Sequence, residues 1–270
     1  MMKKILLIGK KSTLSKIYVK KSRIKNFDIF SHRDFKNINY SKYSHLINFS
    51  FSPKLMSLPY RKEIDIDKKL AIKAKENNII YIFLSTRYVY SKLNTIPVSE
   101  TIKKLKPENN YGKNKLKIEK HLKKNLKKNL LILRLGTFLF LKLSSKGKLF
   151  SEKMLYSLHQ KKLIFFDFKN NIYKDFITDD HFVENLDYLI EKKITGLYNL
   201  SSGIPIFPKD IATNVIKTFN KGKIIFENKN RKAYSFLMSN KKIINKTGII
   251  LNKKKILDFC REMGKKLKYE

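Results

Sequence analysis

The sequence IIYIFLSTRYVY occupies residues 79–90, NNYGKNKLKIEKHLKKNLK occupies residues 109–127, and LLILRL occupies residues 130–135. The first and third segments contain short apolar runs, which are typical of buried strands. The second has apolar residues at spacings of three and four with lysines between them, which predicts an amphipathic helix. A strand, a helix and a second strand in this order predict one unit of a parallel sheet covered by helices.

Similar segments lie on both sides of this unit. Before it we expect strands at 4–8, 28–30 and 45–49 and a helix at 64–77. After it we expect helices at 152–159, from 178 onward, at 208–219 and at 253–268, and strands at 163–166, 172–176, 197–200 and 223–226. The pattern predicts an α/β fold, a Rossmann-type doubly wound parallel sheet with a smaller α/β substrate-binding lobe. We assign residues 1–150 to the dinucleotide-binding domain and 151–270 mainly to the lobe, with segments near 170–200 returning to the sheet.

The charge of the chain is extreme. Its 270 residues carry a formal net charge of +38, and 42% of them are hydrophobic, enough for a full core. Lysines spread along the whole length supply nearly all the positive charge, whereas nucleic-acid-binding proteins gather cations on one face and use arginine for bidentate contacts. We therefore expect no nucleic-acid partner. Anionic small molecules such as dinucleotides and nucleotide sugars would be attracted by the same charge.

Cysteine content and hydropathy indicate the compartment. The single cysteine, Cys260, excludes an internal disulfide and a cysteine-based metal site, so we expect a reducing compartment and no metal. The apolar run in residues 1–11 is too short for a signal peptide, and the run at 130–141 contains Arg134 and is too short to span a membrane. A soluble, cytoplasmic protein without a membrane partner is expected.

Tyr111 and Lys115 are the strongest candidates for catalysis. Four residues apart on a helix, their side chains lie on one face, one turn apart. A lysine ammonium beside a tyrosine stabilises the phenolate and lowers the tyrosine pKa, which makes it an acid or base near neutral pH. Thr86, at the end of the preceding strand, would hold the substrate oxygen. Such a pair also arises by chance in a chain rich in both residues, and the functional interpretation depends on its position after a strand that ends in Ser85-Thr86.

The turn after the first strand is a candidate phosphate site. Residues 9–15 are GKKSTLS, where a Gly-x-x-Gly-x-x-Gly pattern would have glycine in place of Ser12 and Ser15. Gly9 permits a tight turn, and serine hydroxyls can donate to phosphate, but side chains at 12 and 15 would crowd the cofactor and the helix. Arg33, after the second strand, leaves room for the extra phosphate of NADP, where an acid would select NAD. We therefore expect NADP, with NAD as the alternative.

These motifs together resemble the extended short-chain dehydrogenase/reductases, in particular the NAD-dependent epimerases/dehydratases and the dTDP-4-dehydrorhamnose reductase type. The segments that carry the resemblance are ILLIGKKSTLS, SHLINFSFSP, LSTRYVYSKLNTIPVSE, YGKNKLKIEKHL, LILRLGT, YKDFITDDHFVENL and GLYNLSSG. The resemblance implies that Thr86, Tyr111 and Lys115 are catalytic. It also implies that the cofactor contacts Gly9, Lys11, Ser12, Leu14, Arg33, Phe49, Ser50, Tyr111 and Lys115. The substrate would contact Ser85, Thr86, Arg87 and Tyr111.

The resemblance also reduces the number of reactions that the chain is expected to catalyse. Dehydratases of this superfamily carry an Asp-Glu pair where this sequence has Arg87 and Tyr88, so a dehydratase is disfavoured. We expect an NAD(P)-dependent reductase of a nucleotide-activated keto-sugar, in surface polysaccharide biosynthesis, although reductases usually have Asp in place of Arg87. The alternatives are a nucleotide-sugar epimerase with tightly bound NAD and a catalytically silent homologue that binds a sugar nucleotide. A homodimer through the helix of Tyr111 is expected.

Overall fold

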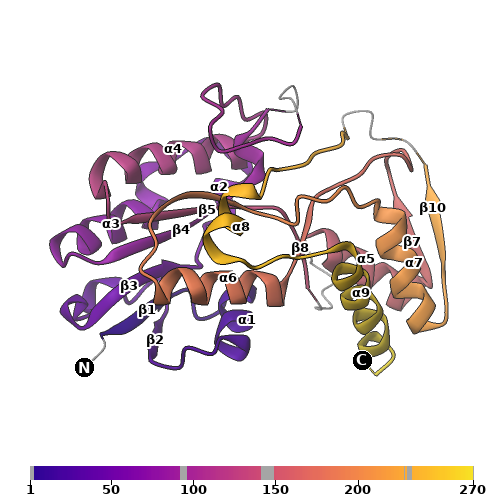
Figure 1. Ribbon diagram of the computed structural model, residues 1–270, viewed down its shortest axis with the longest axis horizontal. Coiled ribbons are helices and arrows are strands. Elements are labelled where there is room, and N and C mark those ends of the chain that lie inside the picture. The colour runs from indigo at the N-terminus through magenta and orange to yellow at the C-terminus, as the bar shows by residue number, and fades with distance from the viewer. Residues whose placement is uncertain (1–2, 92–95, 141–148, 228, 230–232, 270) are drawn as a thin grey trace.

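The computed structural model describes residues 3–91, 96–140, 149–227, 229 and 233–269. Its main sheet has six parallel strands in the order β2-β1-β3-β4-β5-β9 (Figure 1). Their bounds are β1 Lys4–Ile8, β2 Phe27–Phe30, β3 Tyr43–Asn48, β4 Ile80–Thr86, β5 Leu130–Leu135 and β9 Gly196–Leu200. The predicted fold class, a Rossmann-type parallel sheet with a smaller α/β lobe, is confirmed.

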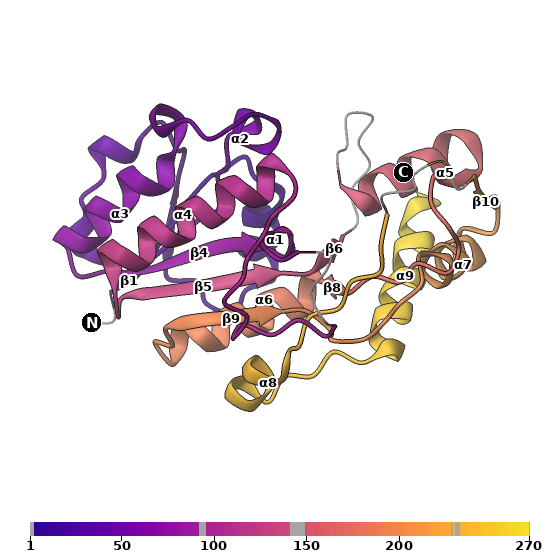
Figure 2. The same ribbon diagram turned by 90° about the horizontal axis from the view of Figure 1, so that it is seen from above.

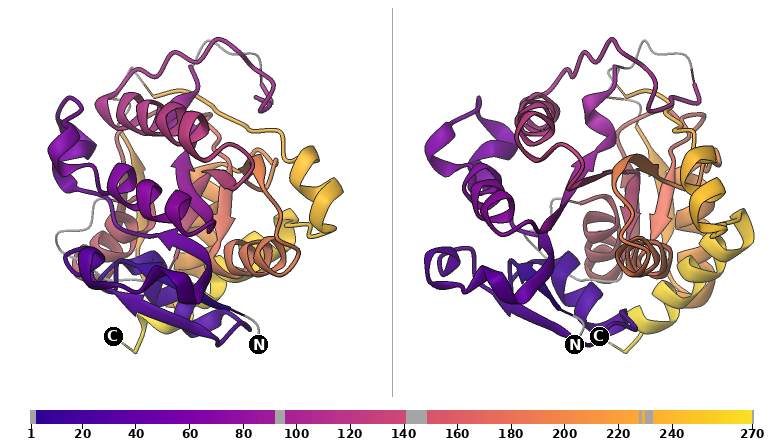
Figure 3. Two further views of the ribbon diagram at one scale, coloured as in Figure 1. Left: turned by 90° about the vertical axis from the view of Figure 1, so that its left-hand side faces the viewer. Right: turned by 60° about the vertical axis from the view of Figure 1, so that its left-hand side comes forward.

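Helices cover both faces of this sheet (Figures 2 and 3). On one face, α3 Ile66–Glu76 and α4 Asn110–Leu126 share a core with the strands. On the other face, α1 Thr13–Lys21 and α6 Asp179–Glu191 contribute to a second core. Every residue of β5 is buried, because both faces of a doubly wound sheet are covered. This burial explains the uninterrupted apolar run at residues 130–135.

The smaller lobe has a core of its own. It contains α5 Phe150–Lys161, α7 Pro208–Phe219 and α9 Lys253–Leu267, and the parallel strand pair of β7 Leu163–Phe166 and β10 Lys223–Phe226. A second pair, β6 Thr137–Leu139 with β8 Phe176–Thr178, lies where the main sheet meets the lobe. The division of the chain at residue 150 stays a prediction.

Most predicted elements are present, and several have the predicted bounds: β1, β5, β7, β10 and α7. The strand predicted at 172–176 is wrong, since only Phe176 belongs to β8. Just before it, the Asp175 carboxylate accepts hydrogen bonds from the backbone amides of Ser202 and Met238 at 2.9 and 3.0 Å, which ties this segment to loops rather than to a strand. Among the elements for which no bounds were predicted are α1 Thr13–Lys21, β6, α2 Pro53–Ser57 and α8 Lys241–Thr247.

The strand order places a crevice at one end of the main sheet. The connections reverse direction between β1 and β3, and ligands of doubly wound folds bind beyond the carboxyl ends of the strands at such a point. Gly9 follows β1, and Phe49 and Ser50 follow β3, so these predicted cofactor residues meet there.

A buried ion pair joins α4 to β5 of the main sheet. Arg134 of β5 donates from Nε and Nη2 to the two carboxylate oxygens of Glu119 on α4, at 3.0 and 2.6 Å. Both side chains are 1% exposed, and Ser85 of β4 donates to the same carboxylate at 2.5 Å. A single carboxylate therefore fixes the positions of β4, β5 and α4 relative to one another.

We expect the Glu119→Gln variant to lose about 3–5 kcal/mol of unfolding free energy, because it leaves the Arg134 charge buried without its counter-charge. Urea denaturation followed by circular dichroism measures this. Glu262→Gln, which breaks the exposed Lys265–Glu262 pair, is the control and should cost less than about 1 kcal/mol. Equal stabilities for the two variants would contradict the structural role of the buried pair.

No helix among the described residues is both long enough and apolar enough to cross a membrane.

Candidate active site

Tyr111 reaches the end of β4 because α4 begins unusually close to it. The Asn109 side chain caps the helix by accepting a hydrogen bond from the Gly112 amide at 2.8 Å. A β-carbon at position 112 would overlap the carbonyl oxygen of Tyr88, which follows β4. Glycine at 112 thus permits the backbone contact that brings Tyr111 next to Thr86.

Tyr111 lies in an aromatic environment. Its ring packs edge-on against Phe51, with 5.5 Å between centroids, and against Tyr88 at 6.1 Å. Burial raises the pKa of Tyr111 to about 12, and the Thr86 side chain, within hydrogen-bonding reach, opposes part of the rise. Thr86 is 5% exposed, and its hydroxyl oxygen also accepts from the Tyr88 amide at 3.3 Å.

Lys115 is buried one turn further along α4. Its ammonium donates to the Leu84 carbonyl oxygen at 2.7 Å and lies over the rings of Phe51 and Phe83, 4.1 and 4.5 Å from their centroids. Burial lowers the pKa of Lys115 to about 8, and the carboxylate of Asp67 is the largest influence that opposes the fall. Cation–π contacts and a nearby carboxylate thus compensate for the loss of water around this ammonium.

One expectation about Tyr111 and Lys115, the direction of the shift in the tyrosine pKa, is wrong. The sequence predicted that Lys115 lowers the pKa of Tyr111, yet the pKa of Tyr111 is raised. Burial is the dominant influence on the phenol, while the ammonium is engaged with the β4 backbone. Tyr111 is therefore a neutral phenol at physiological pH, which is the form that donates a proton.

A cavity of about 800 Å³ opens at the crevice between β1 and β3. Among its lining residues are six of the predicted cofactor residues: Gly9, Lys11, Ser12, Arg33, Phe49 and Ser50. Leu14 is absent from the lining and packs partly buried against the core. Tyr111 and Lys115 also lie outside the lining, but Phe51, which lines the cavity, contacts both. This first cavity therefore ends beside Tyr111 and Lys115.

The turn after β1 accommodates its two serines. Gly9 has φ +112°, and a β-carbon there would lie 2.7 Å from the Ser50 hydroxyl, so glycine is required. Ser15 is fully buried, and its hydroxyl donates to the Gly9 carbonyl oxygen at 2.7 Å, so it stays within the turn. Ser12 precedes α1 without capping it through its side chain, which leaves that hydroxyl beside the cavity. The turn, the open helix amides and the nearby Lys11 suit a diphosphate.

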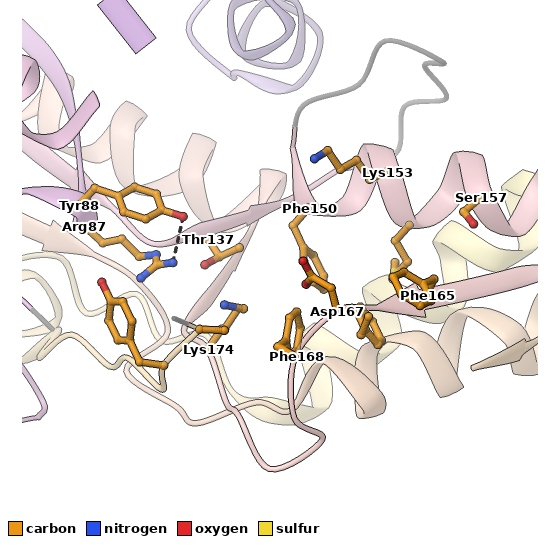
Figure 4. A pocket seen from close by; sticks show the side chains of 14 residues that line it. Arg87, Tyr88, Thr137, Phe150, Lys153, Ser157, Phe165, Asp167, Phe168 and Lys174 are labelled. Atoms are coloured by element: carbon orange, nitrogen blue, oxygen red, sulfur yellow. Dashed lines mark hydrogen bonds between the residues drawn. The ribbon is translucent and has the colours of Figure 1, made fainter. Parts of the chain in front are cut away.

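A second cavity of about 550 Å³ lies between the end of β4 and the smaller lobe (Figure 4). Arg87 and Tyr88 line it from the end of β4, and α5, β7 and the segment after β7 supply aromatic side chains from the lobe. Lys174 and Tyr234 also line it and were not predicted. They are distant from Arg87 in sequence, and no spacing signal marks them.

Ser85 has a different environment from the other predicted substrate residues. It is 2% exposed, its hydroxyl donates to Glu119, and it lines neither cavity. A substrate contact of Ser85 stays a prediction. Within the described part of the chain, no group of three or more His, Cys, Asp or Glu residues is arranged to hold a metal ion.

The chain is similar to known proteins in part of its sequence and in its fold. Residues 60–167 match the family model of the RmlD substrate binding domain. Among curated proteins, none matches by sequence. A UDP-N-acetylglucosamine 4-epimerase from Methanobrevibacter ruminantium M1, solved with UDP-N-acetylmuramic acid, superposes with a TM-score of 0.82 at 16% identity, covering 98% of this chain and 97% of that one.

The chain has the fold of the extended short-chain dehydrogenase/reductases. Two further structures of this fold superpose on it. RMD from Pseudomonas aeruginosa, complexed with NADPH, has a TM-score of 0.80 at 12% identity, with 98% and 99% of the two chains covered. The dTDP-4-dehydrorhamnose reductase from Yersinia enterocolitica has a TM-score of 0.76 at 17% identity, with 97% and 99% covered. The resemblance stated from the motifs is confirmed.

We expect Gly112→Ala to displace the start of α4, because the added methyl group overlaps the Tyr88 carbonyl. The unfolding free energy should fall by about 1–3 kcal/mol, the usual cost of overpacking. Lys113→Ala, at the exposed neighbouring position in the same turn, is the matched control and should change it by less than about 0.5 kcal/mol. Thermal unfolding compares the two variants, and equal melting temperatures would refute the close approach.

Proposed function

We propose that this protein is an NAD(P)-dependent reductase of a nucleotide-activated keto-sugar. The observation that carries the proposal is the position of Tyr111 between the two cavities. Phe51 lines the first cavity and Tyr88 lines the second, and both rings pack against Tyr111. A proton donor in this position faces a cofactor on one side and a substrate on the other.

The first cavity fits a dinucleotide. Gly9 lets the chain pass close to Ser50, and the turn ends at the amino terminus of α1, where backbone amides can bind a diphosphate. Lys10, Lys11, Arg33 and Lys69 line the cavity with one acid, Glu63. When bound, the nicotinamide would supply the hydride that reduces the keto carbon.

Thr86, Tyr111 and Lys115 would position the substrate oxygen and transfer a proton to it. Thr86 would accept or donate a hydrogen bond at the substrate oxygen and fix its position beside Tyr111. As negative charge develops on that oxygen, the Tyr111 hydroxyl would transfer its proton to it. The Lys115 ammonium, one turn away, would stabilise the resulting phenolate once it leaves the Leu84 carbonyl.

The direction of the pKa of Tyr111 favours reduction over epimerisation. An epimerase begins by removing a proton from a hydroxyl, which needs a tyrosinate, whereas a reductase begins with a protonated tyrosine. Burial raises the pKa of Tyr111 to about 12 and keeps the phenol protonated. Loss of a proton from Lys115 near its pKa of about 8 would further disfavour the tyrosinate.

Tyr111→Phe should lower the rate of NADPH-dependent reduction of a nucleotide keto-sugar by about 10²–10⁴-fold, the range that a positioned acid supplies. NADPH binding, followed by fluorescence, should be unchanged. Tyr188→Phe on α6 is the control and should retain full activity. The absence of NADPH and NADH binding at millimolar concentration would overturn the proposal. NAD that stays bound to the purified protein, without net consumption of the cofactor during the reaction, would favour an epimerase. Full biological activity in Tyr111→Phe would favour a silent homologue.

Arg33 supports NADP as the preferred cofactor. It lines the first cavity after β2, where the adenosine ribose of a dinucleotide is expected. Arg33→Gln should weaken NADPH binding about tenfold, as expected for one lost charge-assisted contact, and leave NADH binding nearly unchanged. Lys128→Gln, an exposed change beyond the opposite end of the sheet, controls for net charge. Equal losses for the two cofactors would contradict a role of Arg33 in selecting NADP.

A further inference from the structure

The second cavity contains two cations whose surroundings differ from those of the surface lysines. Arg87 immediately follows Thr86 and is 7% exposed, and Lys174 faces the same cavity from the segment before β8. Figure 4 shows both side chains on the Tyr88 side of the cavity. Lys174 is held in place by two backbone hydrogen bonds with Ile206, at 2.9 and 3.0 Å.

The contacts of Arg87 are with neutral aromatic groups. Its guanidinium carbon lies 4.2 Å from the ring centroid of Tyr88 and 5.2 Å from that of Phe236, and Nη2 donates to the Tyr88 hydroxyl at 3.1 Å. Tyr234 is within hydrogen-bonding reach of the same side chain. A guanidinium has five N–H donors in one plane, so these contacts fix its orientation and leave donors for a ligand.

Within the described part of the chain, no carboxylate forms an ion pair with either of these cations. Neither Arg87 nor Lys174 has an ion-pair partner within 4.0 Å among the described residues. The only Asp or Glu outside those residues is the terminal Glu270. Burial, followed by repulsion from Arg87, lowers the pKa of Lys174 to about 8, and Asp167 opposes this without forming an ion pair. Two unpaired cations in one half-buried cavity favour an anionic ligand group between them.

The position of Arg87 and Lys174 indicates that they would bind the sugar, rather than the diphosphate, of a nucleotide sugar. Tyr88 touches both the Arg87 guanidinium and the Tyr111 ring, so the cations lie one aromatic side chain from the proton donor. In Figure 4, Lys153 and Phe165 lie toward the α5 side of the cavity, and Phe150 and the Asp167 carboxylate lie between them and Arg87. A lysine and aromatic rings on that side suit a diphosphate and a base. The sugar ring is the part of a nucleotide sugar that must lie beside Tyr111.

We infer that the sugar of the bound nucleotide sugar carries a carboxylate, which is held by Arg87 and Lys174. This inference rests on the proposed function and specifies its substrate as an acidic nucleotide sugar. A planar guanidinium binds a carboxylate through two parallel hydrogen bonds, and the Lys174 ammonium adds a third contact.

Isothermal titration of the NADPH-saturated protein with matched nucleotide sugars tests the inference. UDP-glucuronic acid has a carboxylate where UDP-glucose has a hydroxymethyl group, and UDP-N-acetylmuramic acid carries a lactyl ether, which ends in a carboxylate, where UDP-N-acetylglucosamine has a hydroxyl group. In at least one pair the acidic member should bind about tenfold or more tightly than the neutral member, the effect of one charge-assisted contact. Arg87→Gln and Lys174→Gln should each remove most of this preference and change neutral binding less than about threefold. Arg87→Lys should retain part of it, because the charge remains but the paired hydrogen bonds do not.

The controls separate the outcomes. Lys217→Gln, an exposed change on α7, lowers the net charge equally and should leave the preference intact. Similar affinities for the acidic and neutral members of each pair would overturn the inference. Equal losses of acidic and neutral binding in the Arg87 and Lys174 variants would also overturn it, because they would show that the two cations bind the diphosphate. Absence of binding by all four compounds would reject the proposed substrate class itself.

Discussion

The close approach of α4 to β4 is the constraint on which the site depends. The helix begins so near the strand end that position 112 has no room for a β-carbon under the Tyr88 carbonyl. Nearby, the Glu119 carboxylate joins α4 to Ser85 and Arg134 in two adjacent strands. One contact sets the depth of the helix and the other sets its register. Together these two contacts place Tyr111 beside Thr86, and they place Lys115 beneath the carboxyl end of β4.

This arrangement requires charge to be buried near the reactive groups. Lys115 is 5% exposed, and its ammonium is stabilised by a backbone carbonyl, two aromatic rings and the negative charge of Asp67. Asp67 in turn accepts hydrogen bonds from Asn48 and Tyr81, each at 2.7 Å, while burial raises its pKa to about 6. The polar network therefore passes from Lys115 through α3 to β3 and β4. A low-dielectric setting of this kind strengthens interactions with a developing charge.

The two cavities differ in how their positive charge is presented. Around the first cavity, the lysines near the β1 turn belong to an exposed loop, and they suit the diphosphate of a dinucleotide that remains partly in solvent. Around the second, Arg87 is enclosed by aromatic rings, so its charge is directed at a ligand rather than at water. The overall charge of +38 attracts anions to both, but only enclosed cations can select among them.

The sequence by itself determined the parallel sheet, the approximate positions of most helices and the candidates Thr86, Tyr111 and Lys115. Apolar runs and helical spacing are local properties, and both persist because each strand is buried on two faces. Only the tertiary structure decided what surrounds those residues. Ser85 turned out to contact Glu119, the strand predicted at 172–176 gave way to the hydrogen bonds of Asp175, and Lys174 came to face Arg87. The raised pKa of Tyr111 follows from burial between Phe51 and Tyr88, which no local pattern records, because burial depends on segments that meet only in the folded chain.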